Sequence, residues 1–332
     1  MLVEEKRRAE RNRTLSLTGK DRTRLAATLI QNLPPSRLSQ PVTGTIHGDY
    51  RRWVDLLPLA HVDLLFLDPP YNLNKSFNGK QFAKRSTYQY TAWLDDILRS
   101  LIPLLKQTAT VYICGDWLTS HSIFETASSH FFIRNRITWE REKGRGAQTN
   151  YKNASEDIWF CTVGETYTFN LDAVKLRRRV IAPYTDANGN PKDWHRSGAG
   201  NFRDTHPSNL WTDITIPFWS MSENTDHPTQ KSEKLLAKLL LASTRPGDFV
   251  LDPFLGSGTT SVVAKKLGRR YLGIECDLEY CCLAARRLEL ANTNKDIQGF
   301  ADGVFWERNS LSVQKKAMNQ SRDGDIFSNE HS

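Results

Sequence analysis

The chain of 332 residues carries 45 Lys and Arg against 37 Asp and Glu, so its formal net charge is +8. This length suits about two domains, or one large α/β unit with an insertion, and the 9 Trp, 10 Tyr and 15 Phe exclude a disordered chain. The most apolar stretch, residues 235–242, contains Lys238 and is too short to span a membrane, and the charged residues 1–13 lack the apolar segment of a secretory signal. The 5 Cys have neither the spacing of a metal site nor that of a disulfide framework, so we expect a cytoplasmic protein without a bound metal.

The first part of the chain predicts a basic arm followed by buried strands. Residues 1–40 are polar and basic and end at two prolines, which indicates an arm, helical or partly ordered, outside the core. The apolar run 62–67 predicts a buried strand that stops before Pro69 and Pro70, because proline cannot continue a strand ladder. The elements expected next are a helix over residues 92–105, a strand over 110–114 and two paired strands at 137–139 and 158–160.

The second part predicts a polar insertion and then a β-turn-α-β unit. Residues 165–222 are rich in Asn, Asp, Gly, Pro and Trp and show little periodicity, as in an insertion that carries recognition loops. Regular elements return as a helix over 232–243, a strand over 249–251, a helix over 260–267 and a strand over 270–274. From residue 294 the chain is polar, and we expect a loosely held tail.

The turn at residues 252–260 contains Gly256 and Gly258 and joins a predicted strand to a helix. Glycines let a ligand approach the backbone, and the helix N-terminus offers free N–H groups. Glu275 ends the next strand, where a carboxylate can accept hydrogen bonds from two ribose hydroxyls. Ser261 replaces the third glycine of the dinucleotide motif. The turn therefore favours a nucleoside-bearing cofactor without a pyrophosphate; a tight turn with only a packing role is the alternative.

The tetrad Asp68-Pro69-Pro70-Tyr71 follows the first buried strand. In an open parallel sheet, ligands bind beyond the carboxyl ends of the strands. Asp68 and the carbonyl of Pro69 can accept the two N–H groups of an exocyclic amine, while Tyr71 stacks on the ring that carries it. The alternative is a proline-rich loop with an amphipathic tyrosine.

With these two motifs the chain resembles the S-adenosylmethionine-dependent DNA methyltransferases that modify exocyclic amino groups, in the permuted motif order called the beta class. The resemblance extends from Gly48 to Leu290 and rests on the Asp-Pro-Pro-Tyr tetrad preceding the cofactor turn. Ser232 departs from the family, which usually has a second proline there. Further marks of the family are Gly48-Asp49, Trp139, residues 156–160, the His-Pro-Thr-Gln-Lys block at 227–231 and Glu275.

The resemblance implies a Rossmann-like α/β methyltransferase fold with a mixed, mostly parallel twisted sheet and an inserted target-recognition region. A basic arm would precede the catalytic half, and the insertion would separate that half from the cofactor-binding half. The boundaries that we expect are 1–40 for the arm, 41–164 for the catalytic half, 165–222 for the target-recognition insertion, 223–293 for the cofactor-binding half and 294–332 for the polar tail.

The resemblance also implies how S-adenosylmethionine would be bound. Phe254, Gly256 and Gly258 would wrap its methionine end, and Thr229 and Lys231 would hold its carboxylate. A lysine as a point charge suits a carboxylate, although a solvated lysine at a helix start is the alternative. The other residues implied in cofactor binding are Asp49 at the adenine amine, Glu275 at the ribose with Asp277 close by, and Asp252, Ser257 and Thr259 in the turn.

The catalytic residues implied are Asp68, Pro69, Pro70 and Tyr71. Acceptors at Asp68 and Pro69 would favour a pyramidal amine nitrogen, so that methyl transfer is one direct displacement on a base flipped out of the duplex. Methylation at cytosine carbon-5 would need a cysteine nucleophile, and no cysteine follows a proline here. Asp at the first position of the tetrad favours adenine-N6 as the target, and cytosine-N4 is the alternative.

The positive charge is concentrated in two segments. Residues 1–24 hold eight Lys or Arg against four Asp or Glu, and residues 134–152 hold six against two. We expect both segments to contact DNA non-specifically, with Arg141, Lys143 and Arg145 on its phosphate backbone. In the insertion, the residues expected at base edges or phosphates are Arg177, Arg178, Arg179, His195, Arg196, Asn201 and Arg203, with a solvated face as the alternative.

Three other functions stay open from the sequence. The same kind of site could methylate an amide in protein or an amine in RNA, a non-catalytic homologue could bind DNA alone, and a dinucleotide oxidoreductase would need the missing third glycine. The expected partner is double-stranded DNA at the nucleoid, with a cognate restriction endonuclease as a candidate. Monomer and homodimer both remain open.

Overall fold

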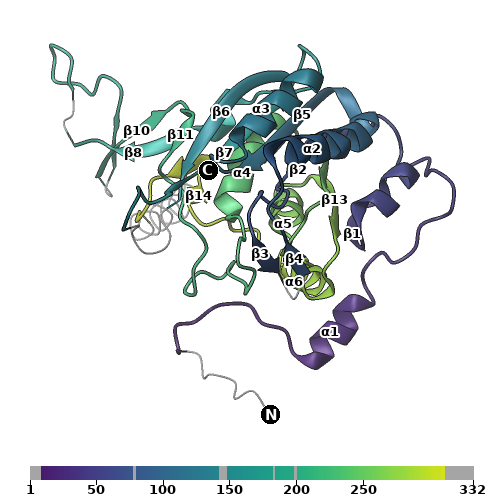
Figure 1. The fold of residues 1–332 in the computed structure, drawn as a ribbon. Helices are drawn as coiled ribbons and strands as arrows, with labels where there is room; N and C mark the ends of the chain where they lie inside the picture. Colours follow the sequence, from purple (N-terminus) through teal and green to yellow (C-terminus); the bar gives the residue numbers. More distant parts are fainter. Residues whose placement is uncertain (1–8, 78–79, 142–147, 182–183, 198–199, 311–332) are drawn as a thin grey trace.

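The centre of the structure is a mixed, mostly parallel sheet of eight strands (Figure 1). The computed structural model describes residues 9–77, 80–141, 148–181, 184–197 and 200–310. In spatial order the strands of the sheet are β1 (Gly44–His47), β13 (Arg270–Glu275), β12 (Phe249–Asp252), β2 (Val62–Leu67), β5 (Leu105–Gly115), β7 (Ser155–Thr162), β6 (Phe132–Glu140) and β11 (Leu210–Trp211). Neighbouring strands from β1 to β5 run parallel, β7 is antiparallel to both β5 and β6, and β11 is parallel to β6.

Helices cover both faces of this sheet. Leu65 and Leu67 of β2 pack toward the helices on one face, and Leu64 and Phe66 pack toward those on the other. Because both faces are buried, β2 is apolar at nearly every position, which is why the run at 62–67 predicts a buried strand. The helices are α2 (Thr87–Leu101) and α3 (Ser120–His130) on the first face, α4 (Glu233–Ser243) and α5 (Thr259–Lys266) on the second, and α6 (Leu278–Leu290) beside β1, β13 and α5.

The predicted strands of the main sheet and the two predicted helices at 232–243 and 260–267 are confirmed. The helix predicted over 92–105 is displaced, because α2 begins at Thr87 and ends at Leu101. The hydroxyl of Ser86 accepts the backbone N–H of Gln89, whose side chain in turn accepts the N–H of Ser86. This capping box starts the helix ahead of its apolar residues. Short 3₁₀ helices span Tyr50–Arg52, Val54–Leu56, Ile102–Leu104 and Leu171–Val174.

A second sheet combines the insertion with the chain that follows residue 299. Its strands, in spatial order, are β14 (Phe300–Ala301), β15 (Val304–Trp306), β8 (Leu176–Arg179), β10 (Gly200–Thr205) and β9 (His195–Ser197). β3 (Lys75–Phe77) and β4 (Lys80–Phe82) pair separately as an antiparallel ribbon. In Figure 1, β8 and β10 lie beyond β6 and β11, at the edge of the molecule opposite β1.

The prediction of a loose tail from residue 294 is wrong for residues 300–306. Phe305 and Trp306 are 0% and 2% exposed, and β15 pairs in parallel with β8. The Trp306 ring meets Phe202 edge-on at 5.4 Å between centroids, and the guanidinium of Arg177 lies 5.4 Å from its centre. Two strands of two and three residues have too little periodicity to stand out in a polar segment. Residues 311–332 lie outside the described residues, and the division into domains otherwise stays a prediction.

The basic arm contains α1 (Gly19–Ala26), which packs on α6. Leu25 is fully buried there, and Arg22 pairs with Glu279 at 2.6 Å. Arg24 pairs with Glu289. Part of the arm's positive charge, which we expected to attract DNA, is therefore paired with acidic residues of α6. Among the described residues, no helix is long and apolar enough to cross a membrane.

A buried cluster of charged residues joins the chain before α4 to three helices. Glu233 of α4 pairs with Lys266 of α5 at 2.6 Å and with Arg287 of α6 at 3.0 Å. The carboxylate of Glu223 accepts the backbone N–H of Glu233 at 2.7 Å. Burial, and next the negative charge of Glu233, raise the pKa of Glu223 above its ordinary value of 4.5.

The raised pKa of Glu223 predicts that the protein becomes less stable toward unfolding as the pH rises. Between pH 4.5 and the raised pKa the folded chain binds more protons at Glu223 than the unfolded chain does, so the free energy of unfolding falls by at most about 1.4 kcal/mol per pH unit. Glu223→Gln should remove that slope, as measured by urea denaturation at pH 5.5 and pH 8. The exposed Glu165→Gln should keep it; equal slopes in all three proteins would contradict the prediction.

Candidate active site

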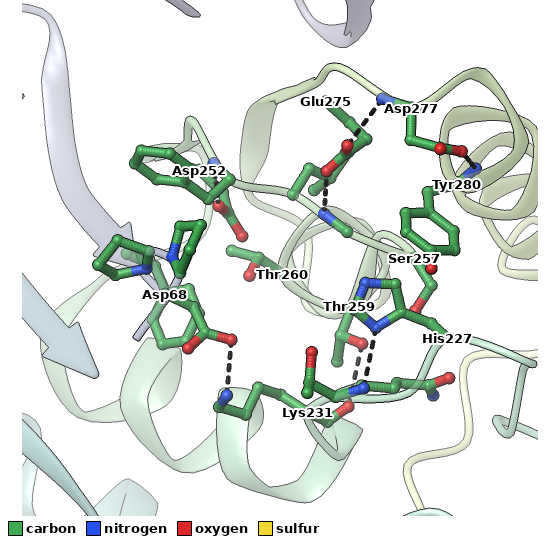
Figure 2. Close-up of a pocket in the computed structure, with 18 of the residues that line it drawn as sticks. Asp68, His227, Lys231, Asp252, Ser257, Thr259, Thr260, Glu275, Asp277 and Tyr280 are labelled. Carbon is green, nitrogen blue, oxygen red and sulfur yellow. Dashed lines mark hydrogen bonds and ion pairs between the residues drawn. The ribbon is translucent and has the colours of Figure 1, made fainter. Parts of the chain in front are cut away.

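The adjacent strands β12 and β2 end at the same edge of the sheet. They are parallel, with Val250 opposite Leu64 and Leu251 opposite Leu65, so Asp252 and Asp68 both lie at this edge, Asp68 two residues beyond the position opposite Asp252. From β12 the sheet continues through β13 to β1, and from β2 it continues through β5 to β7. A cavity opens where the two halves diverge, as expected at the switch point of an α/β sheet (Figure 2).

The predicted glycine-rich turn borders this cavity and requires glycine at two positions. Gly258 precedes α5 with φ +89°, and a Cβ there would lie 2.5 Å from the Cβ of Ala284. Gly256 has φ +56°, and a Cβ there would lie 3.0 Å from the imidazole of His227. The turn thereby combines left-handed backbone with close approach of α6 and of the 227–231 block.

Hydrogen bonds fix the turn against both neighbouring segments. Arg287 of α6 donates to the carbonyl of Ser257 and to the hydroxyl of Thr259, each at 2.9 Å. Thr259 donates to the carbonyl of Lys231 at 3.0 Å. The 227–231 block and the turn, which the resemblance assigned to one cofactor, are therefore held together.

Glu275 lies at the end of β13 and lines the cavity with Asp277 and Tyr280. Its two carboxylate oxygens accept the backbone N–H groups of Gly256 at 2.9 Å and Asp277 at 2.8 Å, drawn as dashed lines in Figure 2. Burial raises the pKa of Glu275, against these two bonds. The carboxylate predicted to bind a ribose is thus held in one orientation beside the glycine-rich turn.

Asp68 and Lys231 form an ion pair inside the cavity. The Lys231 ammonium lies 2.6 Å from Oδ2 of Asp68 and is 7% exposed. The hydroxyl of Tyr71 donates to the other oxygen of Asp68 at 3.1 Å. Burial strongly raises the pKa of Tyr71, so this hydroxyl stays protonated. The sequence did not suggest that Lys231 contacts the catalytic tetrad; its predicted role at a cofactor carboxylate stays a prediction.

Glu156 and Arg141 complete the charged lining of the cavity. Glu156, on β7, is 4% exposed, and Arg141 pairs with its Oε1. Its Oε2 lies 3.4 Å from the Lys231 ammonium. Arg141 was expected at a phosphate, yet in the structure it lines the cavity. In the sequence, Glu156 belongs to a block typical of the family but has no predicted role, because a single glutamate beside apolar strand residues forms no motif of its own.

His227 and Asp252 are buried titratable groups of the same cavity. Burial lowers the pKa of His227 to about 4, so its imidazole is neutral at physiological pH. Its Nδ1 accepts the N–H of Thr229 at 3.3 Å, which assigns the proton to Nε2. Burial raises the pKa of Asp252 to about 7, and its carboxylate accepts the N–H of Phe254 at 3.0 Å.

Asp49 lines an adjoining cavity on the other side of Phe254. Pro70, Phe254 and Glu275 border both spaces. Asp49 accepts the N–H of Arg51 at 3.0 Å, at the start of a 3₁₀ helix that follows β1. Between them the two cavities are lined by every described residue of the predicted catalytic and cofactor set except Gly258, which lies in the turn but lines neither cavity.

The described residues among those predicted to contact DNA do not gather at one place. Arg177 pairs with Asp204 at 2.7 Å, and Arg203 pairs with Asp193 at 2.7 Å. Both pairs belong to the second sheet or its border, where Arg178 is half-buried and Arg179 is exposed. Lys143, Arg145 and the side chain of Arg196 lie outside the described residues, so the DNA contacts stay predictions.

Comparison with known proteins supports the DNA methyltransferase expected from the sequence. A family model described as DNA methylase matches residues 62–286. The chain is 33% identical over 265 residues to the DNA adenine methyltransferase YhdJ of Escherichia coli (strain K12), covering 78% of this chain and 86% of that protein. It is 32% identical over 235 residues to the type II methyltransferase M.HpaI of Haemophilus parainfluenzae, covering 69% and 68%.

Solved structures agree on the fold. The PvuII DNA methyltransferase (cytosine-N4-specific) matches with a TM-score of 0.54 at 17% identity, over 84% of this chain and 94% of that one. TTHA0409 of Thermus thermophilus, described as a DNA modification methylase complexed with S-adenosyl-L-methionine, matches with a TM-score of 0.51 at 21% identity, over 81% and 99%. The predicted Rossmann-like methyltransferase fold is confirmed. Because the family model spans most of the sheet and both predicted motifs, the protein belongs to the N6/N4 DNA methylase family.

Proposed function

We propose that the protein transfers a methyl group from S-adenosylmethionine to the N6 amine of an adenine in double-stranded DNA. Membership of the family makes it an S-adenosylmethionine-dependent DNA amino-methyltransferase. The observation that carries the proposal is that Asp68 and Glu275 line one cavity, although they end strands on opposite sides of β12. An acceptor for an amine and an acceptor for a ribose therefore open onto the same space.

The residues around the glycine turn fit S-adenosylmethionine. Glu275 is oriented by two backbone N–H groups, one of them that of Gly256, and glycine at position 256 leaves room for the His227 imidazole that also lines the cavity. The adjoining cavity would take the adenine between Asp49 and Phe254, with Asp277 near the ribose. When bound, the cofactor supplies an electrophilic methyl group on its sulfonium sulfur.

The Asp68 carboxylate and the carbonyl of Pro69 would orient the target amine. Each carboxylate oxygen has two acceptor sites, so Asp68 can accept an amine N–H in addition to the Tyr71 hydroxyl. Methyl transfer would form a C–N bond as the C–S bond of the cofactor breaks, and Asp68 is the adjacent carboxylate that would accept the proton lost by the methylated nitrogen. Tyr71 lies over the Lys231 ammonium at 5.6 Å and would stack on the flipped base.

Adenine is favoured over cytosine by two observations. The tetrad begins with Asp68, and the relative YhdJ is named as a DNA adenine methyltransferase. Cytosine-N4 remains the alternative, because the PvuII enzyme of the same fold is cytosine-N4-specific. The two products differ in the base that carries the methyl group.

A DNA substrate supports a location at the nucleoid in the cytoplasm as part of this proposal. Two relatives are type II methyltransferases, which makes a cognate restriction endonuclease a candidate partner. Both a monomer and a homodimer are compatible with a cavity built from one chain. The arginines of the second sheet and the residues near Arg141 are the candidates for DNA contacts.

Mass spectrometry of nucleosides tests the choice of base. After incubation of unmethylated plasmid DNA with the protein and S-adenosylmethionine, N6-methyladenine should be the product. RNA and protein substrates of matched concentration should gain no methyl groups. N4-methylcytosine alone would select the alternative, and methylated RNA or protein without methylated DNA would refute the proposal.

Asp68→Asn tests the acceptor of the target amine. The substitution keeps the size of the side chain but replaces one acceptor oxygen by an NH₂ donor, which repels the amine N–H groups. We expect kcat to fall roughly 10²-fold or more, as for the loss of one oriented group in a displacement. The Kd for S-adenosylmethionine, measured by calorimetry, should change less than about threefold. Full activity of this variant would contradict the role of Asp68 as the acceptor of the target amine.

Glu275→Gln tests the ribose acceptor in the cofactor site. One of its two backbone donors would then face an amide NH₂, so the turn and the ribose contact both weaken. The Kd for S-adenosylmethionine should rise roughly 10-fold or more, the effect of losing one charged hydrogen bond. Glu279→Gln, in the first turn of α6 and paired with Arg22 at the surface, is the matched control and should bind as the wild type does.

A further inference from the structure

We propose that Glu156 is a positioning residue that receives the Lys231 ammonium from Asp68 when the target amine binds. This inference rests on the proposed function, because it concerns the acceptor for the target amine. It gives a role to a buried carboxylate of the cavity that the methyl transfer described above does not use.

The geometry places one ammonium between two carboxylates. Lys231 lies 2.6 Å from Oδ2 of Asp68 and 3.4 Å from Oε2 of Glu156. The shorter contact is a hydrogen bond, whereas Oε2 of Glu156 has no hydrogen-bond partner among the described residues. A small movement of the ammonium would therefore exchange one hydrogen-bonded carboxylate for the other.

Burial explains why the ammonium needs a second partner. Lys231 is 7% exposed and Glu156 is 4% exposed. Burial by itself would lower the pKa of Lys231, but the carboxylates of Asp68 and Glu156 outweigh it and raise that pKa, so the side chain stays charged. An ammonium that stays on Oδ2 of Asp68 neutralises the carboxylate that should attract the target amine, whereas an ammonium that leaves Asp68 without a new acceptor would be unpaired in a site of low dielectric, which is strongly unfavourable.

Arg141 holds Glu156 in place for this exchange. It pairs with Oε1, on the side of the carboxylate away from the unpartnered Oε2. The four side chains carry two positive and two negative charges, so the exchange leaves the charge of the cavity unchanged. A glutamate with a purely structural role would need only the Arg141 pair and would not have to face Lys231.

The test compares variants at saturating S-adenosylmethionine under single-turnover conditions. Glu156→Gln should lower the rate of methyl transfer roughly 10-fold to 100-fold, because Lys231 then stays on Asp68. The Kd for the cofactor and the Kd for DNA should each change less than about threefold. Asp157→Asn, the next residue on β7, accepts from the Thr138 hydroxyl and is the matched control with an unchanged rate.

A double-mutant cycle separates this role from a structural one. In a Lys231→Met background, Glu156→Gln should have little further effect, because there is no ammonium left to position. Equal losses in both backgrounds, or an unchanged rate in the single variant, would overturn the proposal. Glu156→Asp provides the same test if the Gln variant unfolds, since it keeps the charge but withdraws it by one methylene. A wild type inactive on DNA would instead refute the proposed function itself.

Discussion

The parallel pairing of β12 with β2 is the constraint on which the rest of the site depends. These strands come from distant parts of the chain, and their register brings Asp252 and Asp68 to one edge. The site residues beyond that edge lie in loops or in the first turns of helices. Hydrogen bonds such as those from Arg287 to Ser257 and from Thr259 to Lys231 hold these segments in place. The rigid sheet therefore sets the distance between the two motifs, and the loops set only their orientation.

Charge balance is the second requirement of this arrangement. The cavity holds a buried ammonium and a half-buried guanidinium beside two carboxylates, and a second, buried cluster surrounds Glu233. Arg287 belongs to both regions, because it pairs with Glu233 and also donates to Ser257. Buried charges of this kind are costly unless each is paired, so their geometry is more sharply defined than that of an apolar core.

Much of the main sheet could be predicted from the sequence, because strands buried on both faces are continuous apolar runs, as at 62–67. The motif residues Asp68 and Glu275 could be placed because each directly follows or ends such a run. The second sheet could not, since strands as short as Phe300–Ala301 have no readable period. Nor could the pairing of Lys231 with Asp68, because contacts between residues 163 positions apart depend on the finished sheet.

The pairing of β15 with β8 has a consequence for the order in which the chain can fold. Residue 176 of the insertion is opposite residue 305, so the middle strand of the second sheet obtains this neighbour only after nearly the whole described chain has been synthesised. Contacts so distant along the chain form late and slowly, because a long loop must close first. During synthesis the edge of β8 that pairs with β15 therefore stays unpaired until the end. The main sheet, in contrast, can assemble once β12 and β13 have been made.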